Sequence, residues 1–174
     1  MGDEKRIAFD LQSYVERVRS GPCFVCGILN GDERFAAHIV YRDDHHVAFL
    51  PNFHVLLGYV LVASTEHREA VVGDFTIDEY LALQTVVHRV ASALAATVPT
   101  ERIYVLSLGS QQGNAHVHWH VAALPPGVPY HEQQFAALMT EAKGVLAISD
   151  DEQAALAAQL RNALDYQPAE EPRR

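Results

Sequence analysis

Ten consecutive residues, 115–124, constrain the fold more than any other stretch of the chain. Their sequence is AHVHWHVAAL, in which three histidines alternate with apolar residues. A period of two is the period of a β-strand, so the three imidazoles leave one face and the valine and tryptophan side chains leave the other. β-Branched and aromatic residues favour a strand with one buried side. The stretch therefore predicts a strand whose apolar face packs on a core and whose other face carries the histidines.

The three histidines are His116, His118 and His120. Neighbouring side chains on one face of a strand lie about 6.5–7 Å apart, so three rings can line one phosphate-sized site. A lone histidine on a strand is usually structural, but three buried imidazoles would each need a hydrogen-bond partner. Two functional interpretations stay open here: phosphate chemistry, or an H-x-H pair that binds a metal with a third ligand from elsewhere. Residues 109–114, GSQQGN, are expected to form a turn whose backbone N–H groups can approach an anion.

Composition sets the broad class of the protein. Its 174 residues are enough for one domain with a core, and 49% apolar with 20% charged residues is typical of a globular protein. The net charge of −9 argues against broad binding to nucleic acid or an anionic membrane, but not against a nucleotide in a local site. No apolar run approaches about 18 residues, and the N-terminus lacks the apolar region of a signal peptide. We therefore expect no membrane span and a cytoplasmic location.

Five strands and four helices are expected. We predict strands over residues 37–42, 46–50, 58–63, 102–108 and the histidine stretch, and helices over residues 7–18, 77–98, 131–142 and 150–164. Capping boxes, TIDE from Thr76 and SDDE from Ser149, open the second and fourth of these helices. Short connections favour antiparallel neighbours, so the predicted fold class is α+β: a five-stranded, mainly antiparallel sheet with one long helix packed on it.

The chain is expected to divide into four parts. An N-terminal segment with a helix covers residues 1–20, and the sheet domain covers residues 21–128. A helical C-terminal extension follows over residues 129–166, and the polar residues 167–174 are expected to be a disordered tail.

Two cysteines, Cys23 and Cys26, form a CxxC motif that is expected to lie in a loop. Two thiolates at this spacing suit a tetrahedral zinc ion, but two further ligands would have to be brought by the fold. The alternative is a pair of packed, reduced cysteines. A thioredoxin-like redox pair would need a βαβ context, which the pattern does not predict.

The run from His116 to Ala122 resembles the signature of the histidine triad (HIT) family, His-φ-His-φ-His-φ-φ, where φ is apolar. Gln112, four residues before the first histidine, is similar to the lead-in of that signature, and the order of elements from Cys23 to Leu124 resembles a HIT domain. The resemblance implies a HIT-like fold. It also implies that His118 is a nucleophile that forms a nucleotidyl-histidine intermediate, and that His120 contacts the phosphate and helps the leaving group. This agrees with the chemistry of a neutral imidazole, which can attack phosphorus and split one hard step into two.

The resemblance also implies a metal site. In zinc-bearing relatives a CxxC, a histidine after the third strand and the first triad histidine bind the ion, which places a structural zinc on Cys23, Cys26, His67 and His116 here. Four protein ligands leave no open position, so such a zinc would not activate water.

Four further residues are candidates for binding substrate. Gln112 and the backbone of the turn up to Gly113 could hold phosphate oxygens, and Ser107 could contact the phosphates from the neighbouring strand. Asn52 stands next to Pro51, where the family has an Asp or Asn that binds the ribose. The chain departs from the family pattern at Gly113, in place of a hydroxyl residue, and at Pro125-Pro126, in place of Pro-Arg.

The resemblance implies a nucleotide hydrolase or nucleotidyl transferase that acts on phosphoramidates or dinucleoside polyphosphates. Its expected partners are a purine nucleotide or conjugate and a second copy of the chain, because HIT proteins are commonly homodimers through the long helix and the sheet edge. Two alternatives remain: a mononuclear zinc hydrolase that uses the H-x-H pair, and a non-catalytic nucleotide-binding adaptor.

Overall fold

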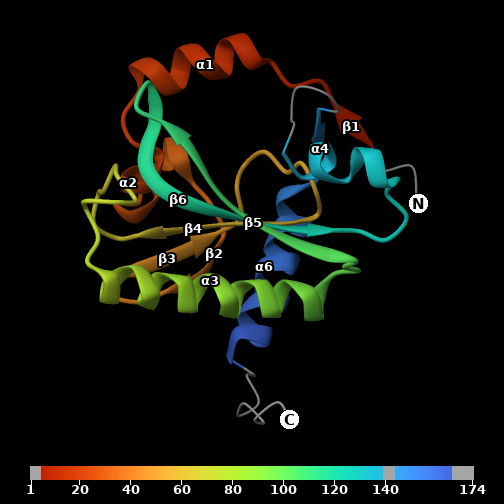
Figure 1. Cartoon of the computed structure of the whole chain (residues 1–174). Coiled ribbons are helices and arrows are strands. Elements are labelled where there is room, and N and C mark those ends of the chain that lie inside the picture. Colours follow the sequence, from red (N-terminus) through yellow and green to blue (C-terminus); the bar gives the residue numbers. More distant parts are fainter. Residues whose placement is uncertain (1–4, 139–143, 166–174) are drawn as a thin grey trace, which may run out of the picture.

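A five-stranded antiparallel sheet is the centre of the molecule (Figure 1). The computed structural model describes residues 5–138 and 144–165, so the predicted tail lies outside the described residues. The strand order is β2-β3-β4-β6-β5, and every neighbouring pair is antiparallel. The strands are β2 (Ile39–Arg42), β3 (His46–Phe49), β4 (Gly58–Ser64), β5 (Arg102–Ser110) and β6 (Gly113–Leu124). This confirms the predicted α+β fold.

One face of the sheet is covered by the long helix α3 (Ile77–Thr97), with α6 (Asp150–Asp165) beside it (Figure 1). The predicted capping box opens α3, because the Thr76 side chain accepts from the Glu79 amide while the Glu79 carboxylate accepts from the Thr76 amide. Trp119 and Val121 from the histidine strand are buried in this core. The apolar half of the alternating pattern therefore packs where the sequence predicts.

The opposite face carries the histidines and is covered by shorter elements, α1 (Leu11–Ser20), α2 (Phe24–Leu29) and α4 (Gln133–Leu138). Val25 and Ala137 are fully buried in the second core on this side, with Phe49 and Leu124 of the sheet. Because both faces are covered, the sheet is the middle of three layers.

The N-terminal helix begins later than its apolar spacing predicts. Ile7 was expected to open it, but β1 (Arg6–Ile7) pairs with β7 (Val145–Leu146) near the other end of the chain. The helix α1 begins at Leu11, where the Asp10 side chain accepts from the Ser13 amide. A pairing between segments about 140 residues apart in sequence overrides the local helical pattern.

The CxxC motif is not the loop that the sequence suggested. Cys23 is the N-cap of α2, and its sulfur accepts from the Cys26 amide at 3.5 Å. Gly27 permits this helix to approach a side chain, since a Cβ there would lie 2.3 Å from the Phe35 ring. The prediction of a loop is therefore wrong, because a short capped helix fixes the spacing of the two thiols.

The C-terminal extension begins with η2 (Tyr130–Glu132), which continues into α4. The predicted helix over residues 131–142 is observed as far as Leu138, and its remainder lies outside the described residues. Ser149 and Glu152 form the second capping box, and α6 is observed as far as Asp165, the last residue that the structure describes. No helix in the described part of the chain has the length and apolar character to cross a membrane.

Candidate functional site

The three histidines of β6 share one face of the sheet, and they take part in two different groups of side chains. His116 is 1% and His118 is 3% exposed, although both rings are polar. The Nδ1 atom of His116 faces the two cysteines, whereas His118 and His120 line a cavity on the same side of the sheet. The strand thus contributes one histidine to a candidate metal centre and two to a candidate substrate site.

The ring of His118 is held with one nitrogen available. Its Nδ1 lies 2.7 Å from the carbonyl oxygen of His116, so Nδ1 carries the proton and donates, and Nε2 keeps its lone pair. Burial lowers the pKa of His118 below its ordinary value, which keeps the ring neutral near pH 7. The ring of Phe24 packs against His118 edge-on at 5.4 Å between centroids. The result is an oriented, unprotonated nitrogen beside a cavity.

His120 lies next to this ring, with 4.8 Å between the two centroids. Its Nδ1 is 2.9 Å from the hydroxyl of Tyr59, which itself is 5% exposed. Its Nε2 is buried and has no hydrogen-bond partner among the described residues. Burial, followed by the nearby His118, lowers the pKa of His120 to about 3. A buried polar atom without a partner requires an explanation, and a catalytic role is one of the recognised ones.

The cavity beside these rings has a volume of about 800 Å³ and mostly apolar walls. Asn52 lines it, as the sequence analysis expected, together with Gly109, which lies near the end of β5 and not in the turn that was expected over residues 109–114. Tyr59 and Asn114 also line it, and sequence reasoning missed both. The strand period places Tyr59 on the histidine face once its register opposite Ala122 is known. Asn114 lies at the beginning of β6, where its backbone adopts a positive φ of 58°.

Three predicted substrate-binding residues do not line the cavity. Ser107 is paired with Trp119, so its side chain lies on the α3 side of the sheet, and its hydroxyl donates to the His118 carbonyl at 3.2 Å. The Gln112 amide oxygen accepts from Arg19 of α1 at 2.6 Å. Gly113 permits α1 to pack closely, because a Cβ there would lie 3.1 Å from the Val18 side chain. In this structure Ser107 contacts the backbone of the histidine strand, and Gln112 and Gly113 contact the helix α1.

The four predicted zinc ligands come together from three distant parts of the chain. One ligand atom from each of Cys23, Cys26, His67 and His116 lies within 4.8 Å of all the others. The sulfur-to-Nδ1 distances are 3.5 Å for Cys23–His116, 3.3 Å for Cys26–His67 and 3.8 Å for Cys26–His116. A tetrahedral zinc with Zn–S of about 2.3 Å and Zn–N of about 2.0–2.1 Å would place such atoms about 3.6 Å apart. The four residues therefore fit a zinc ion.

Second partners orient both imidazoles for this role. The Nε2 of His67 lies 3.1 Å from the Glu69 carboxylate, and the Nε2 of His116 lies 3.1 Å from the Ser64 carbonyl. Because each Nε2 can donate, each Nδ1 presents its lone pair to the cysteines. Burial, with the neighbouring Cys23, raises the pKa of the Cys26 thiol to about 11. Two adjacent thiolates would therefore require a nearby cation such as zinc.

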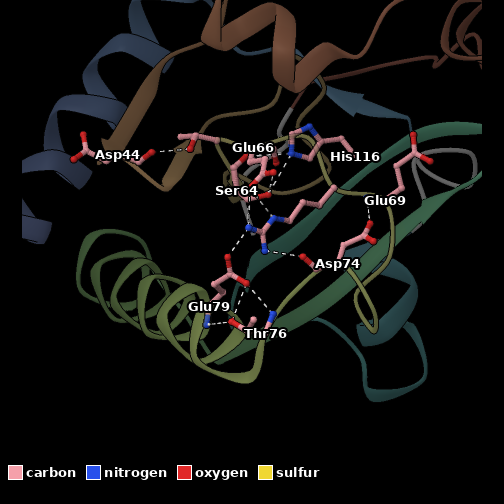
Figure 2. A network of polar contacts seen from close by, with 10 residues as sticks. Asp44, Ser64, Glu66, Glu69, Asp74, Thr76, Glu79 and His116 are labelled. Carbon is pink, nitrogen blue, oxygen red and sulfur yellow. Dashed lines mark hydrogen bonds and ion pairs between the residues drawn. The ribbon is translucent and has the colours of Figure 1, made fainter.

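A polar network holds the loop that carries His67 (Figure 2). The guanidinium of Arg68 donates to Glu66 at 2.8 Å and to Glu79 of α3 at 2.6 Å. The backbone carbonyl of Arg68 accepts a hydrogen bond from the amide of Val117, the residue after His116, at 2.7 Å. The network thus connects the start of the long helix, the ligand loop and the histidine strand, as the labelled side chains in Figure 2 show.

Comparisons with known proteins identify the family of the chain. A family model described as the HIT domain matches residues 33–126, more than half of the chain. An uncharacterized HIT-like protein of Saccharolobus solfataricus is 29% identical over 102 residues, which are 57% of this chain and 71% of that protein. A hypothetical histidine triad nucleotide-binding protein from Sulfolobus tokodaii is 20% identical, with a TM-score of 0.65 over 82% of this chain and 92% of that one. A Zn-bound histidine triad family protein from Mycobacterium smegmatis is also 20% identical, with a TM-score of 0.62 over 82% and 93% of the two chains. The chain belongs to the histidine triad (HIT) family.

Proposed function

We propose that this protein is a nucleotide hydrolase or nucleotidyl transferase that acts on nucleoside-phosphate conjugates through a nucleotidyl-histidine intermediate. The observation that carries the proposal is the geometry of His118. Its Nδ1 proton is held by the His116 carbonyl at 2.7 Å, and its Nε2 lone pair is available beside a cavity of about 800 Å³. Neutral imidazole nitrogen is a competent nucleophile toward phosphorus.

The reaction proceeds in two displacements at one phosphorus atom. In the first, His118 Nε2 forms a bond to the α-phosphorus while the bond to the leaving group breaks, and the leaving group departs with that electron pair. In the second, water attacks the phosphorus and releases a proton to solvent, while the P–N bond breaks and returns its electron pair to Nε2. A nucleoside monophosphate leaves, and another nucleophile in place of water would give transfer instead of hydrolysis.

His120 acts as a hydrogen-bond donor to the atom that gains negative charge. We assign the Tyr59 hydroxyl as the donor to His120 Nδ1, because burial raises the pKa of Tyr59 to about 12 and keeps the phenol protonated. The proton of the neutral imidazole then resides on Nε2, the atom that lacks a partner among the described residues. A hydrogen-bond donor directed at the atom that gains negative charge typically raises the rate about 10²–10³-fold in a site of low dielectric. This corresponds to a barrier lowered by about 3–4 kcal/mol.

A structural zinc on Cys23, Cys26, His67 and His116 supports the site from one end of the strand. When bound, the ion would neutralise the two thiolates and join α2 to β6, and four protein ligands leave it no position for water. The zinc-bound solved relative supports this assignment. The mononuclear alternative is disfavoured because the Nδ1 atoms of His116 and His118 face different partners.

The cavity and the sheet edge suggest the partners. Mostly apolar walls with Asn52 at the rim suit a nucleoside, and we assign the ribose contact to Asn52. The outer strand β5 is a nine-residue edge with exposed Val105 and Leu108, and unpaired edges of this kind favour pairing with another chain. We assign a homodimer through β5 and α3, and its mass in solution can be measured by light scattering.

A trapping experiment tests the catalytic proposal. The protein is mixed with adenosine 5′-phosphoramidate or diadenosine triphosphate, quenched in alkali, and digested for mass analysis. One adenylyl group on His118, absent in His118→Ala, is the expected result. Turnover that persists in His118→Ala would refute the nucleophile. Nucleotide binding without any adduct or turnover in the wild type would instead favour the adaptor alternative.

A further inference from the structure

The wall of the cavity carries basic but no acidic side chains, although the chain as a whole is strongly anionic. The net charge is −9, yet the charged side chains that line the cavity are Arg17 and Arg34, with no carboxylate among the lining residues. Acidic residues outnumber basic ones by 22 to 13 in the sequence, so their exclusion from this wall points to an anionic ligand.

The two arginines differ in their availability. Arg34 is neutralised by Asp32, with Nε 3.0 Å from Oδ1 and Nη2 2.5 Å from Oδ2. The guanidinium of Arg17 instead lies 5.9 Å from the Tyr14 ring centroid and 5.8 Å from that of Phe53. Arg17 forms no ion pair in the described ranges, and Asp10 is an exposed acidic residue whose pKa is lowered by hydrogen bonds from Ser13 and, to a lesser degree, by the charge of Arg17. Rings that face a guanidinium restrain it without occupying its N–H donors, so Arg17 can still bind a phosphate.

Fixed contacts hold Arg17 at the cavity. The Asn114 amide of β6 donates to the Tyr14 hydroxyl at 2.7 Å, and Val18 packs on Gly113 of the same strand. The helix α1 therefore lies over the beginning of β6, the end of the strand that precedes His118 (Figure 1). None of this helix belongs to the region that the family model matches, residues 33–126.

We infer that Arg17 is a specificity-determining residue that binds a phosphate-bearing leaving group, so that the preferred conjugates carry a phosphate chain and not an amine. The inference rests on the proposed function and adds the class of leaving group. A cation on the wall of the cavity that His118 also lines stabilises an anionic leaving group as it gains charge, but offers nothing to a neutral amine. The bonds that form and break at phosphorus are those of the proposed reaction.

Two substrates that share the same transferred group provide the test. Diadenosine triphosphate and adenosine 5′-phosphoramidate both give an adenylyl group to His118, so the second displacement is identical. In Arg17→Gln, we expect kcat/KM for the triphosphate to fall about 10- to 100-fold, because one or two charge-assisted hydrogen bonds are lost. We expect kcat/KM for the phosphoramidate to stay within about twofold. Arg17→Lys should restore part of the loss. Arg42→Gln removes the same charge from an exposed position at the end of β2, outside the cavity, and should change neither value.

Equal losses for both substrates, or no loss for either, would overturn the inference. Equilibrium binding of AMP and of the α,β-methylene analogue of ATP gives a readout that does not depend on turnover. The wild type should bind the analogue more tightly than AMP, and Arg17→Gln should lose that margin. If the margin is lost as expected but the wild type turns over neither substrate, the proposed catalysis fails and the anion subsite stands. If turnover occurs and the margin is unchanged, the subsite fails and the catalysis stands.

Discussion

Replacement of Tyr59 by phenylalanine isolates the contact that orients His120. The substitution removes only the hydroxyl, which lies 2.9 Å from His120 Nδ1, and leaves the ring in the core. A hydrogen bond of this kind is worth about 0.5–1.5 kcal/mol net, and a buried acceptor left without its donor costs about 1–3 kcal/mol. We expect Tyr59→Phe to lose about 1–3 kcal/mol of stability, a fall in Tm of roughly 2–12 °C for a chain of this size.

The same contact sets which nitrogen of His120 carries the proton. If about 0.5–1.5 kcal/mol of preference for the productive tautomer is lost, the rate falls about 2- to 13-fold where departure of the leaving group limits it. The effect should depend on the leaving group, because a p-nitrophenolate needs little help and an amine needs much. The assay compares kcat/KM for a nucleoside p-nitrophenyl phosphate and for a phosphoramidate, with the first expected to stay within about twofold.

Tyr104 provides a matched control for this substitution. It stands opposite Ala122 from β5, as Tyr59 does from β4, and none of the described residues hydrogen-bonds to its hydroxyl. Tyr104→Phe should leave both rates and the Tm nearly unchanged. Equal losses on the two substrates in Tyr59→Phe, or no loss on either, would refute the assignment of Tyr59 as the donor to His120.

Two further predictions concern the metal cluster and the polar network. Purified wild-type protein should contain about one zinc per chain by elemental analysis, and Cys23→Ser or a chelator should remove it with a fall in Tm; a metal-free wild type of unchanged stability would contradict the zinc assignment. Hydrogen bonds from Arg68 and then from Thr76 lower the pKa of Glu79 to about 2. The carboxylate therefore stabilises the fold above its ordinary pKa near 4.5, and this contribution should be lost as the pH falls from about 4.5 toward 2. Glu79→Gln should flatten the stability curve in that window, and identical curves for the two proteins would exclude the contribution.

Local sequence patterns were sufficient for the sheet, the long helix and the face of the histidines. The alternation from His116 to His120 has the period of a strand, and only that conformation separates imidazoles from Trp119 and its apolar neighbours. The capping box at Thr76 is equally local, because both of its hydrogen bonds close within four residues. These features depend on spacing along the chain, so they can be read before any tertiary contact is known.

Tertiary structure alone decided how the remaining segments meet the site. Ser107 was expected at the phosphates, but the register of β5 against β6 places it opposite Trp119, and a shift of one residue would have reversed its face. The register changes between Leu108 and Ser110, where Gly109 has a φ of 134°. The four zinc ligands were proposed from a family resemblance, but only the tertiary packing of α2, β6 and the loop after β4 brings their donor atoms within 4.8 Å of one another. Arg17 could not be found from the sequence, because its place at the cavity depends on contacts of α1 with residues about 100 positions away.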